Sequence, residues 1–163
     1  GLGDVYKRQA YYRSGQGDVA IRKFREVAPD LIDGTDPVVD GTNWWWAIET
    51  ANILGKVGER DRAQDLLNKA LQVIDSMPRL GYAGFGIADA EIYALLGDKE
   101  KALTALALAV EQGWRSSWRL KTEMNDNLAI LHDDPRFKDI LAAVRSEMAE
   151  QLARVKAKEA LSE

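Results

Sequence analysis

The 163-residue chain holds few side chains of the kinds that perform acid–base, nucleophilic or metal chemistry. Its single histidine, His132, precedes Asp133 and Asp134, and the chain has no cysteine. A catalytic or metal site at this histidine would need further partners at helical or loop spacing. The aspartates are better explained as a helix N-cap, because carboxylates accept from free backbone N–H groups and Pro135 suits the first helical position.

Other catalytic patterns are incomplete in the same way. Ser116 and Ser117 have no base nearby in the sequence. Gly81, Gly84 and Gly86 lack the Lys-Ser/Thr pair that follows the glycines of a phosphate-binding loop. We therefore expect no catalytic residue, no metal site and no cofactor, and we expect that the chain is not an enzyme.

Three consecutive tryptophans are the only local feature that indicates binding. Trp44, Trp45 and Trp46 stand at the predicted start of a helix, where neighbouring side chains point about 100° apart. Three such side chains cannot share one core, so at least one is expected at a surface, where aromatic side chains often anchor partners. We name Trp44 and Trp46 as exposed-aromatic candidates beside Trp45. The alternative for each of them is that the preceding segment 29–43 folds over it.

A repeated spacing of glycine, alanine and a bulky apolar residue predicts the elements that position these side chains. Alanine follows glycine after five residues, and the bulky residue follows after four more, in the sets Gly15, Ala20, Phe24; Gly58, Ala63, Leu67; and Gly97, Ala102, Leu106. The glycine suits a tight turn between two helices, and the alanine permits a close helix crossing. Since one such helix pair cannot bury its own apolar face, the spacing predicts several stacked pairs. The insertions 29–43 and 78–86 are expected to be loops.

This pattern, over residues 10–113, resembles the tetratricopeptide repeat. The resemblance implies an all-α fold, an α-solenoid of stacked antiparallel helix pairs. In that family the first helix of each pair lines a concave groove. The resemblance assigns to this groove Trp45, Ile48, Asn52 and Lys56 in the second unit, Ile87, Glu91 and Leu95 in the third, and Tyr12 and Arg13 in the first.

The two ends of the chain depart from the repeat. Residues 4–9 resemble the translation of a transposon-end adapter used in making sequencing libraries, and Arg8 stands where the other units have Ala51 and Ala90. We therefore treat residues 1–9 as non-native, expect native sequence to be missing upstream, and expect a damaged first helix pair. Residues 10–134 should form the repeats and a connection.

Residues 135–163 are predicted to form a long capping helix with one polar face. Its apolar residues recur every three or four positions, namely Phe137, Ile140, Leu141, Val144, Met148, Leu152 and Val155. A polar outer face on the last element keeps a helical stack soluble. The run from Gly113 to Phe137 also resembles the closing segment of tetratricopeptide regions in bacterial signalling proteins.

Composition and resemblance together predict a binding function. The net charge of −4 argues against nucleic-acid binding by this fragment, and the longest apolar stretch, 102–110, is too short for membrane insertion. We expect a protein–protein interaction scaffold, the C-terminal part of a larger bacterial protein, that binds a peptide or protein in the concave groove. The alternative is a ligand-sensing domain of a signalling or transcriptional regulator. The sequence leaves open the identity of the partner, the oligomeric state, and whether this soluble chain is cytoplasmic or periplasmic.

Overall fold

The protein is all-helical in the part that its computed structural model describes, residues 16–160, where there is no strand. This confirms the predicted all-α class. The elements in chain order are α2 (Gly17–Arg25), α3 (Pro29–Asp33), α4 (Trp44–Lys56), α5 (Arg60–Asp75), α6 (Ala88–Leu95), α7 (Lys99–Glu111), α8 (Trp118–Lys121), the 3₁₀ helix η1 (Asp126–Leu131) and α9 (Pro135–Ala160). The predictions for residues 1–9, Tyr12, Arg13 and Gly15 fall outside the described residues.

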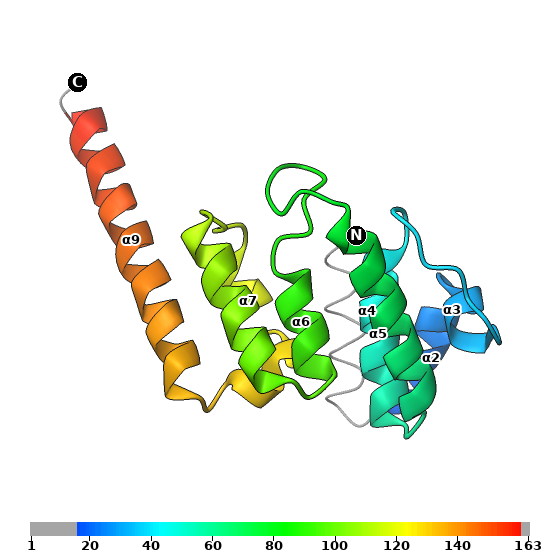
Figure 1. The fold of residues 1–163 in the computed structure, drawn as a ribbon. Coiled ribbons are helices and arrows are strands. Elements are labelled where there is room, and N and C mark those ends of the chain that lie inside the picture. The colour runs from blue at the N-terminus through cyan, green and yellow to red at the C-terminus, as the bar shows by residue number, and fades with distance from the viewer. Residues whose placement is uncertain (1–15, 161–163) are drawn as a thin grey trace.

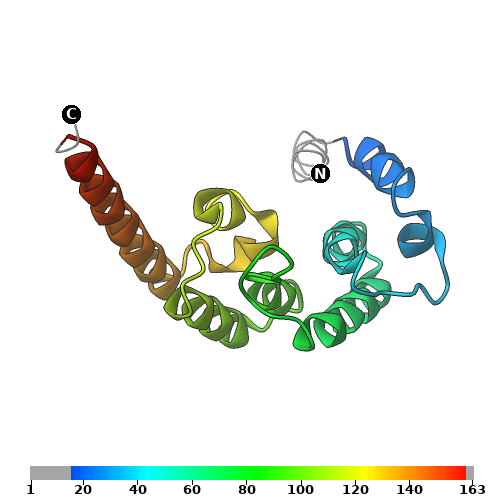
Figure 2. The same cartoon turned by 90° about the horizontal axis from the view of Figure 1, so that it is seen from above.

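The helices follow one another along a curve from α2 to α9 (Figure 1). Viewed from above, α4, α8 and η1 lie on the inner side of this curve, and α5 and α7 lie on its outer side (Figure 2). Helix α4 packs against α5, and α6 packs against α7. No helix of residues 16–160 has both the length and the apolar character needed to cross a membrane.

The same turn closes each of these helix pairs. Gly58, between α4 and α5, has a φ of 93°, and Gly97, between α6 and α7, has a φ of 83°. In each turn the residue after the glycine donates its backbone N–H to a carbonyl five residues earlier, Glu59 to Leu54 and Asp98 to Tyr93, both at 2.9 Å. Glycine adopts this left-handed conformation without steric cost, so the repeated glycine has its predicted role at both positions.

Small residues bring the paired helices close together, as the spacing predicts. Ala63 and Ala102 are buried near the start of α5 and α7, and the bulky residues Leu67 and Leu106 are buried one turn later. A Cβ atom at Gly55 in α4 would lie only 4.0 Å from the Cβ atom of Ala63. Side chains larger than these would hold the helix axes further apart.

The first insertion differs from the predicted loop. Residues 29–33 form helix α3, which begins at Pro29 and buries Leu31 and Ile32. Two adjacent apolar side chains gain enough from burial to favour this short helix within a segment rich in aspartate, glycine and proline. The second insertion, 78–86, is a loop of turns, as predicted.

The C-terminal end packs against the rest of the protein over part of its length. The connection after α7 contains α8 and η1, and Leu128 and Leu131 of η1 are fully buried. Helix α9 begins at Pro135, where Asp134 accepts a hydrogen bond from the backbone N–H of Arg136 at 2.9 Å. This confirms the N-cap predicted from the sequence.

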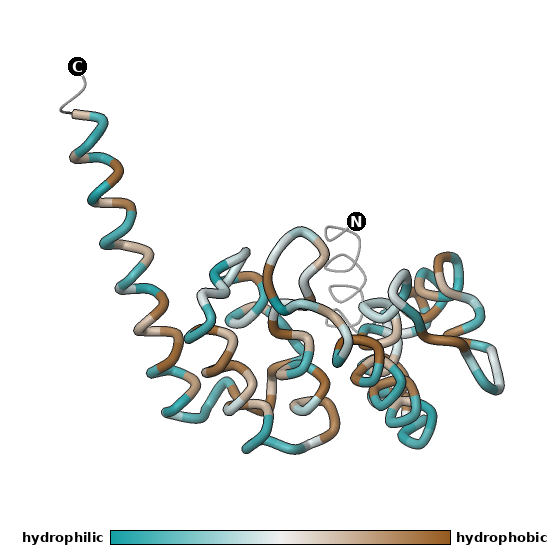
Figure 3. The backbone as a smooth tube through the Cα atoms, turned by 45° about the horizontal axis from the view of Figure 1, so that its top comes forward, coloured by the Kyte–Doolittle hydropathy of each residue, from teal (hydrophilic) through white to brown (hydrophobic). Residues whose placement is uncertain are grey.

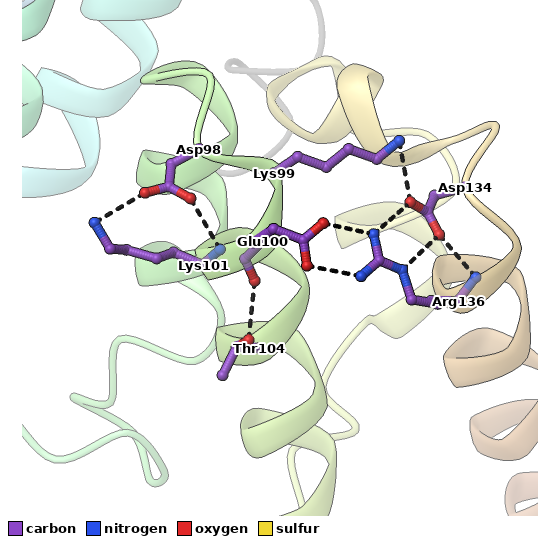
Figure 4. Close-up of polar contacts among 7 residues, drawn as sticks. All are labelled: Asp98, Lys99, Glu100, Lys101, Thr104, Asp134 and Arg136. Carbon is purple, nitrogen blue, oxygen red and sulfur yellow. Dashed lines mark hydrogen bonds and ion pairs between the residues drawn. The ribbon is translucent and has the colours of Figure 1, made fainter.

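A network of charged side chains joins the start of α7 to the start of α9 (Figure 4). Asp134 lies 3.0 Å from both Lys99 and Arg136, and Arg136 also forms two bonds to Glu100, at 2.7 and 2.8 Å. The hydrogen bond from Arg136 is the main cause that holds the pKa of Asp134 well below its ordinary value, and Lys99 adds to it. Asp134 is therefore a charged N-cap at neutral pH.

We predict that Asp134→Ala lowers the thermal midpoint by on the order of 5 °C, because the cap and both cation contacts are lost. The deficit should shrink as the pH falls below about 3.8, the ordinary pKa of an aspartate, because the stabilisation depends on the ionised carboxyl. Differential scanning calorimetry measures both effects. Asp133→Ala removes an exposed neighbouring carboxylate and should change the midpoint little. An equal loss in the two variants would contradict this assignment.

We also predict that Gly58→Ala lowers the free energy of unfolding by about 1–2 kcal/mol, because a side chain is strained at this positive φ. Nothing lies within 4 Å of the added Cβ atom, so the cost is purely conformational. Urea titration followed by circular dichroism measures the change. Gly41→Ala is the matched control, since it also has open space and lacks a positive φ.

Candidate functional site

Two of the predicted groove positions of the third unit, Ile87 and Glu91, lie against the protein's own chain. Ile87 is 1% exposed and lies in one apolar core with Leu128 and Leu131. Glu91 on α6 faces Asn127 of η1. The assignment of Ile87 to an open groove surface is therefore wrong, because η1 packs along α6 and fills the space that a partner would need.

A buried polar cluster forms where α4, α6 and η1 meet, and Asn127 stands at its centre. The Asn127 side chain is 1% exposed. Its Nδ2 donates to Glu49 Oε1 at 3.0 Å and to Glu91 Oε2 at 3.1 Å, and its Oδ1 accepts from Asn52 Nδ2 at 2.6 Å. One amide thereby satisfies polar groups from two other helices, as buried polar groups require.

The carboxyl of Glu91 in this cluster binds a proton more tightly than an ordinary glutamate does. Burial raises the pKa of Glu91 from its ordinary 4.5 to about 7, and the nearby charge of Glu49 adds to this rise. The hydrogen bonds from Asn127 and Asn125 and the charge of Lys121 oppose it. Glu91 is consequently protonated in part of the molecules at neutral pH.

The other chemistry-bearing side chains have structural contacts. His132 Nε2 lies 3.1 Å from the carbonyl oxygen of Thr122, and its ring centroid lies 5.6 Å from that of Phe137. Within residues 16–160, no three His, Cys, Asp or Glu side chains gather in a way that could hold a metal ion.

The predicted groove positions of the second unit divide between core and surface. Ile48 is 2% exposed within the core that α4 shares with α5, so its assignment to the groove surface is wrong. Asn52 is buried in the polar cluster through its bond to Asn127. Lys56 lies at the surface, with its Nζ 3.5 Å from Asp126 of η1.

The tryptophan run places Trp45 at the surface. Trp45 is 40% exposed, whereas its two neighbours are partly buried. Trp44 packs against the core of α4 and α5, and Trp46 meets Phe24 edge to face at 6.1 Å between ring centroids. The exposed-aromatic candidates Trp44 and Trp46 are therefore half-buried, against the core and α2 respectively, and Trp45 is the most exposed ring of the run.

A cleft of about 400 Å³ opens between α4, α5 and α6, and three predicted groove residues line it. Those three are Asn52, Lys56 and Leu95. Its other lining residues are Ala51, Gly55, Arg60, Ala63, Gln64, Leu67 and Leu96. The alanine and leucine side chains give the cleft an apolar floor, and the polar side chains form its rim.

Arg60 and Gln64 are the cleft residues that the sequence reasoning missed. Both lie in the first turns of α5, and the family pattern places the groove on the first helix of a pair only. Arg60 makes no ion pair with any described residue, so its guanidinium is available to a guest. Its position two residues after the turn glycine Gly58 was the signal that could have identified it.

Comparison of the chain with models of protein families, with curated proteins and with solved structures finds no match in any of the three. The resemblance to tetratricopeptide repeats therefore remains a prediction from the sequence.

We predict that Glu91→Gln removes part of the pH dependence of stability. The folded-state pKa of about 7 exceeds the ordinary 4.5, so the folded protein binds this proton more tightly than the unfolded chain does. The free energy of unfolding of the parent protein should therefore fall as the pH rises from 5 to 8, by about 2 kcal/mol more than that of the variant.

Urea titrations at several pH values measure this difference. Glutamine keeps an oxygen that can accept from Asn127, so the variant should fold at every pH tested. Glu111→Gln changes an exposed glutamate of α7 and should keep the parent pH dependence. Parallel pH profiles for Glu91→Gln and the parent protein would contradict the raised pKa.

Proposed function

We propose that the chain is a tetratricopeptide-like α-solenoid that serves as a protein-interaction scaffold within a larger bacterial protein. Support for the solenoid comes from the two helix pairs with identical turns, their arrangement along a curve, and the long helix at the end (Figure 2).

The cleft between α4, α5 and α6 is the observation on which the proposed binding rests. Its floor of Leu67, Leu95 and alanines offers apolar contact to an aliphatic or aromatic side chain. Its rim presents the cations of Lys56 and Arg60 beside the amide of Gln64. This combination suits a peptide segment in which an apolar side chain is followed closely by an aspartate or glutamate.

A second candidate function is the sensing of a small ligand by a regulator. The observation that favours it is the indole Nε1 of Trp114, which is buried and finds no acceptor in the structure. A Cβ atom at Gly86 would lie 3.2 Å from this nitrogen and 3.9 Å from Lys121 Nζ, so two donors lie near one another. Thermal-shift screening with small carboxylates tests this candidate, and a flat response would count against it.

We predict that a display library of short random peptides, selected on the protein, enriches sequences with an apolar residue next to an acidic one. Arg60→Glu should weaken binding of an enriched peptide by at least about tenfold. The change replaces a cation of the cleft rim by an anion, which repels the acidic residue of the peptide. Fluorescence anisotropy of a labelled peptide measures the affinity. Arg22→Glu makes the same change at an exposed arginine of α2 and should leave binding intact.

A filling variant tests the apolar floor separately. Leu95→Trp adds bulk at a partly buried cleft position and should also weaken the peptide. Enrichment of basic or purely polar peptides would contradict the proposal, and so would unchanged affinity in both cleft variants.

A further inference from the structure

Asn127 of η1 brings carboxylates from two different helices to one nitrogen atom. Its Nδ2 lies 3.0 Å from Glu49 Oε1 on α4 and 3.1 Å from Glu91 Oε2 on α6, so these two oxygens are at most about 6 Å apart. Glu49 is 9% exposed, and Glu91 is partly buried. Because like charges so close together repel each other, the pair favours a state in which one carboxyl holds a proton.

The surroundings of this pair are largely apolar. Leu128 and Leu131 of η1 share one buried core with Ile87 of α6. Brown apolar positions recur through the central helices in Figure 3. Water screens charges poorly in such surroundings, so the repulsion between the two carboxylates is stronger than it would be at the surface.

The charged groups of α8 and η1 reduce this repulsion without removing it. The positive charge of Lys121, at the end of α8, opposes the rise in the pKa of Glu91. Asp126 of η1 lies 3.5 Å from the Nζ of Lys56, so that these two charges oppose each other. Burial and the charge of Glu49 outweigh Lys121, since the pKa of Glu91 is about 7.

Charged side chains on the other elements that pack against α6 have contacts of their own. Asp89, the second acidic residue of α6, forms an ion pair with Arg79 at 2.7 Å. Arg60 of α5 lines the cleft. On α7, ion pairs at 3.0 and 2.8 Å join Lys99 to Asp134 and Lys101 to Asp98.

The same short helix holds two residues of the cleft between α4, α5 and α6. Asn127 Oδ1 accepts from Asn52 Nδ2 at 2.6 Å, and Asp126 pairs with Lys56. Asn52 and Lys56 both line the cleft. A movement of η1 would therefore change the contacts of two cleft residues at once.

We propose that this cluster is a pH-sensitive latch, in which loss of a proton from the Glu49–Glu91 pair releases η1 from α6 and from the cleft. With one carboxyl neutral, both N–H bonds of the Asn127 amide are used and η1 stays in place. With both carboxyls ionised, their repulsion is relieved when η1 moves away and water enters. The effect on a peptide in the cleft rests on the proposed function, whereas the release of η1 does not.

Native-state hydrogen exchange on the full chain, followed by NMR from about pH 5.5 to about pH 8, tests the latch without any peptide. Protection factors remove the intrinsic pH dependence of amide exchange. The protection of η1, Asp126–Leu131, should fall at least about tenfold over this range, because the folded-state pKa of Glu91 exceeds the ordinary 4.5. It should also stay below that of α5, because η1 opens while the other helices remain folded.

Three glutamine variants separate the contributions to this fall. Glu91→Gln removes the titrating group and should make the protection of η1 nearly independent of pH. Glu49→Gln removes the nearby charge and should reduce the fall. Glu111→Gln changes an exposed glutamate of α7 and should behave like the parent protein.

Three results would overturn the latch. One is a protection of η1 that does not change with pH in the parent protein. Another is an unchanged fall in Glu91→Gln. The third is equal protection of η1 and α5 at every pH, because η1 would then leave α6 only when the whole protein unfolds.

Discussion

The buried amide of Asn127 is the contact on which the middle of this protein depends. It bonds Glu49 and Asn52 of α4 and Glu91 of α6, which are separated from it by 78, 75 and 36 residues in the sequence. Backbone atoms cannot make such a connection between helices, because the helices have already used their own backbone groups. Loss of this amide would remove one hydrogen bond from each of Glu49, Asn52 and Glu91, which is costly inside a protein. Asn127 thus holds η1 against α4 and α6 together with the buried side chains of Leu128 and Leu131.

This contact also decides which surfaces remain open. Since η1 lies along α6, the inner face of α6 is covered, and Ile87 and Glu91 face the protein's own chain. The seam between α4, α5 and α6 stays open, and the small residues Ala51, Gly55 and Ala63 are among those that line it. Short side chains at this position leave space that longer ones would fill.

The helix turns and the helix N-cap could be predicted from the sequence because they depend on residues close to one another in the chain. The conformations of Gly58 and Gly97 depend only on residues within one turn, and so does the N-cap at Asp134, so spacing alone identified them. The binding surface was harder to predict because exposure is set by distant segments. Trp44 and Trp46 are partly covered by the core and by α2, while Trp45 is exposed. Neither the exposure of Trp45 nor the hydrogen bonds of Asn127 can be predicted from a periodic pattern in the sequence.

Helix α9 shows how one sequence pattern can serve two environments. Its apolar period does not change between Phe137 and Val155, yet burial ends after Val144. A cap that served only to close the stack would need apolar residues only where the body lies, and a polar sequence beyond that point would be more soluble. The continued stripe is thus not explained by folding of the monomer. One flank changes from the acidic Glu147 to the basic Arg154, whereas the other, with Arg145 and Lys156, is basic at both ends.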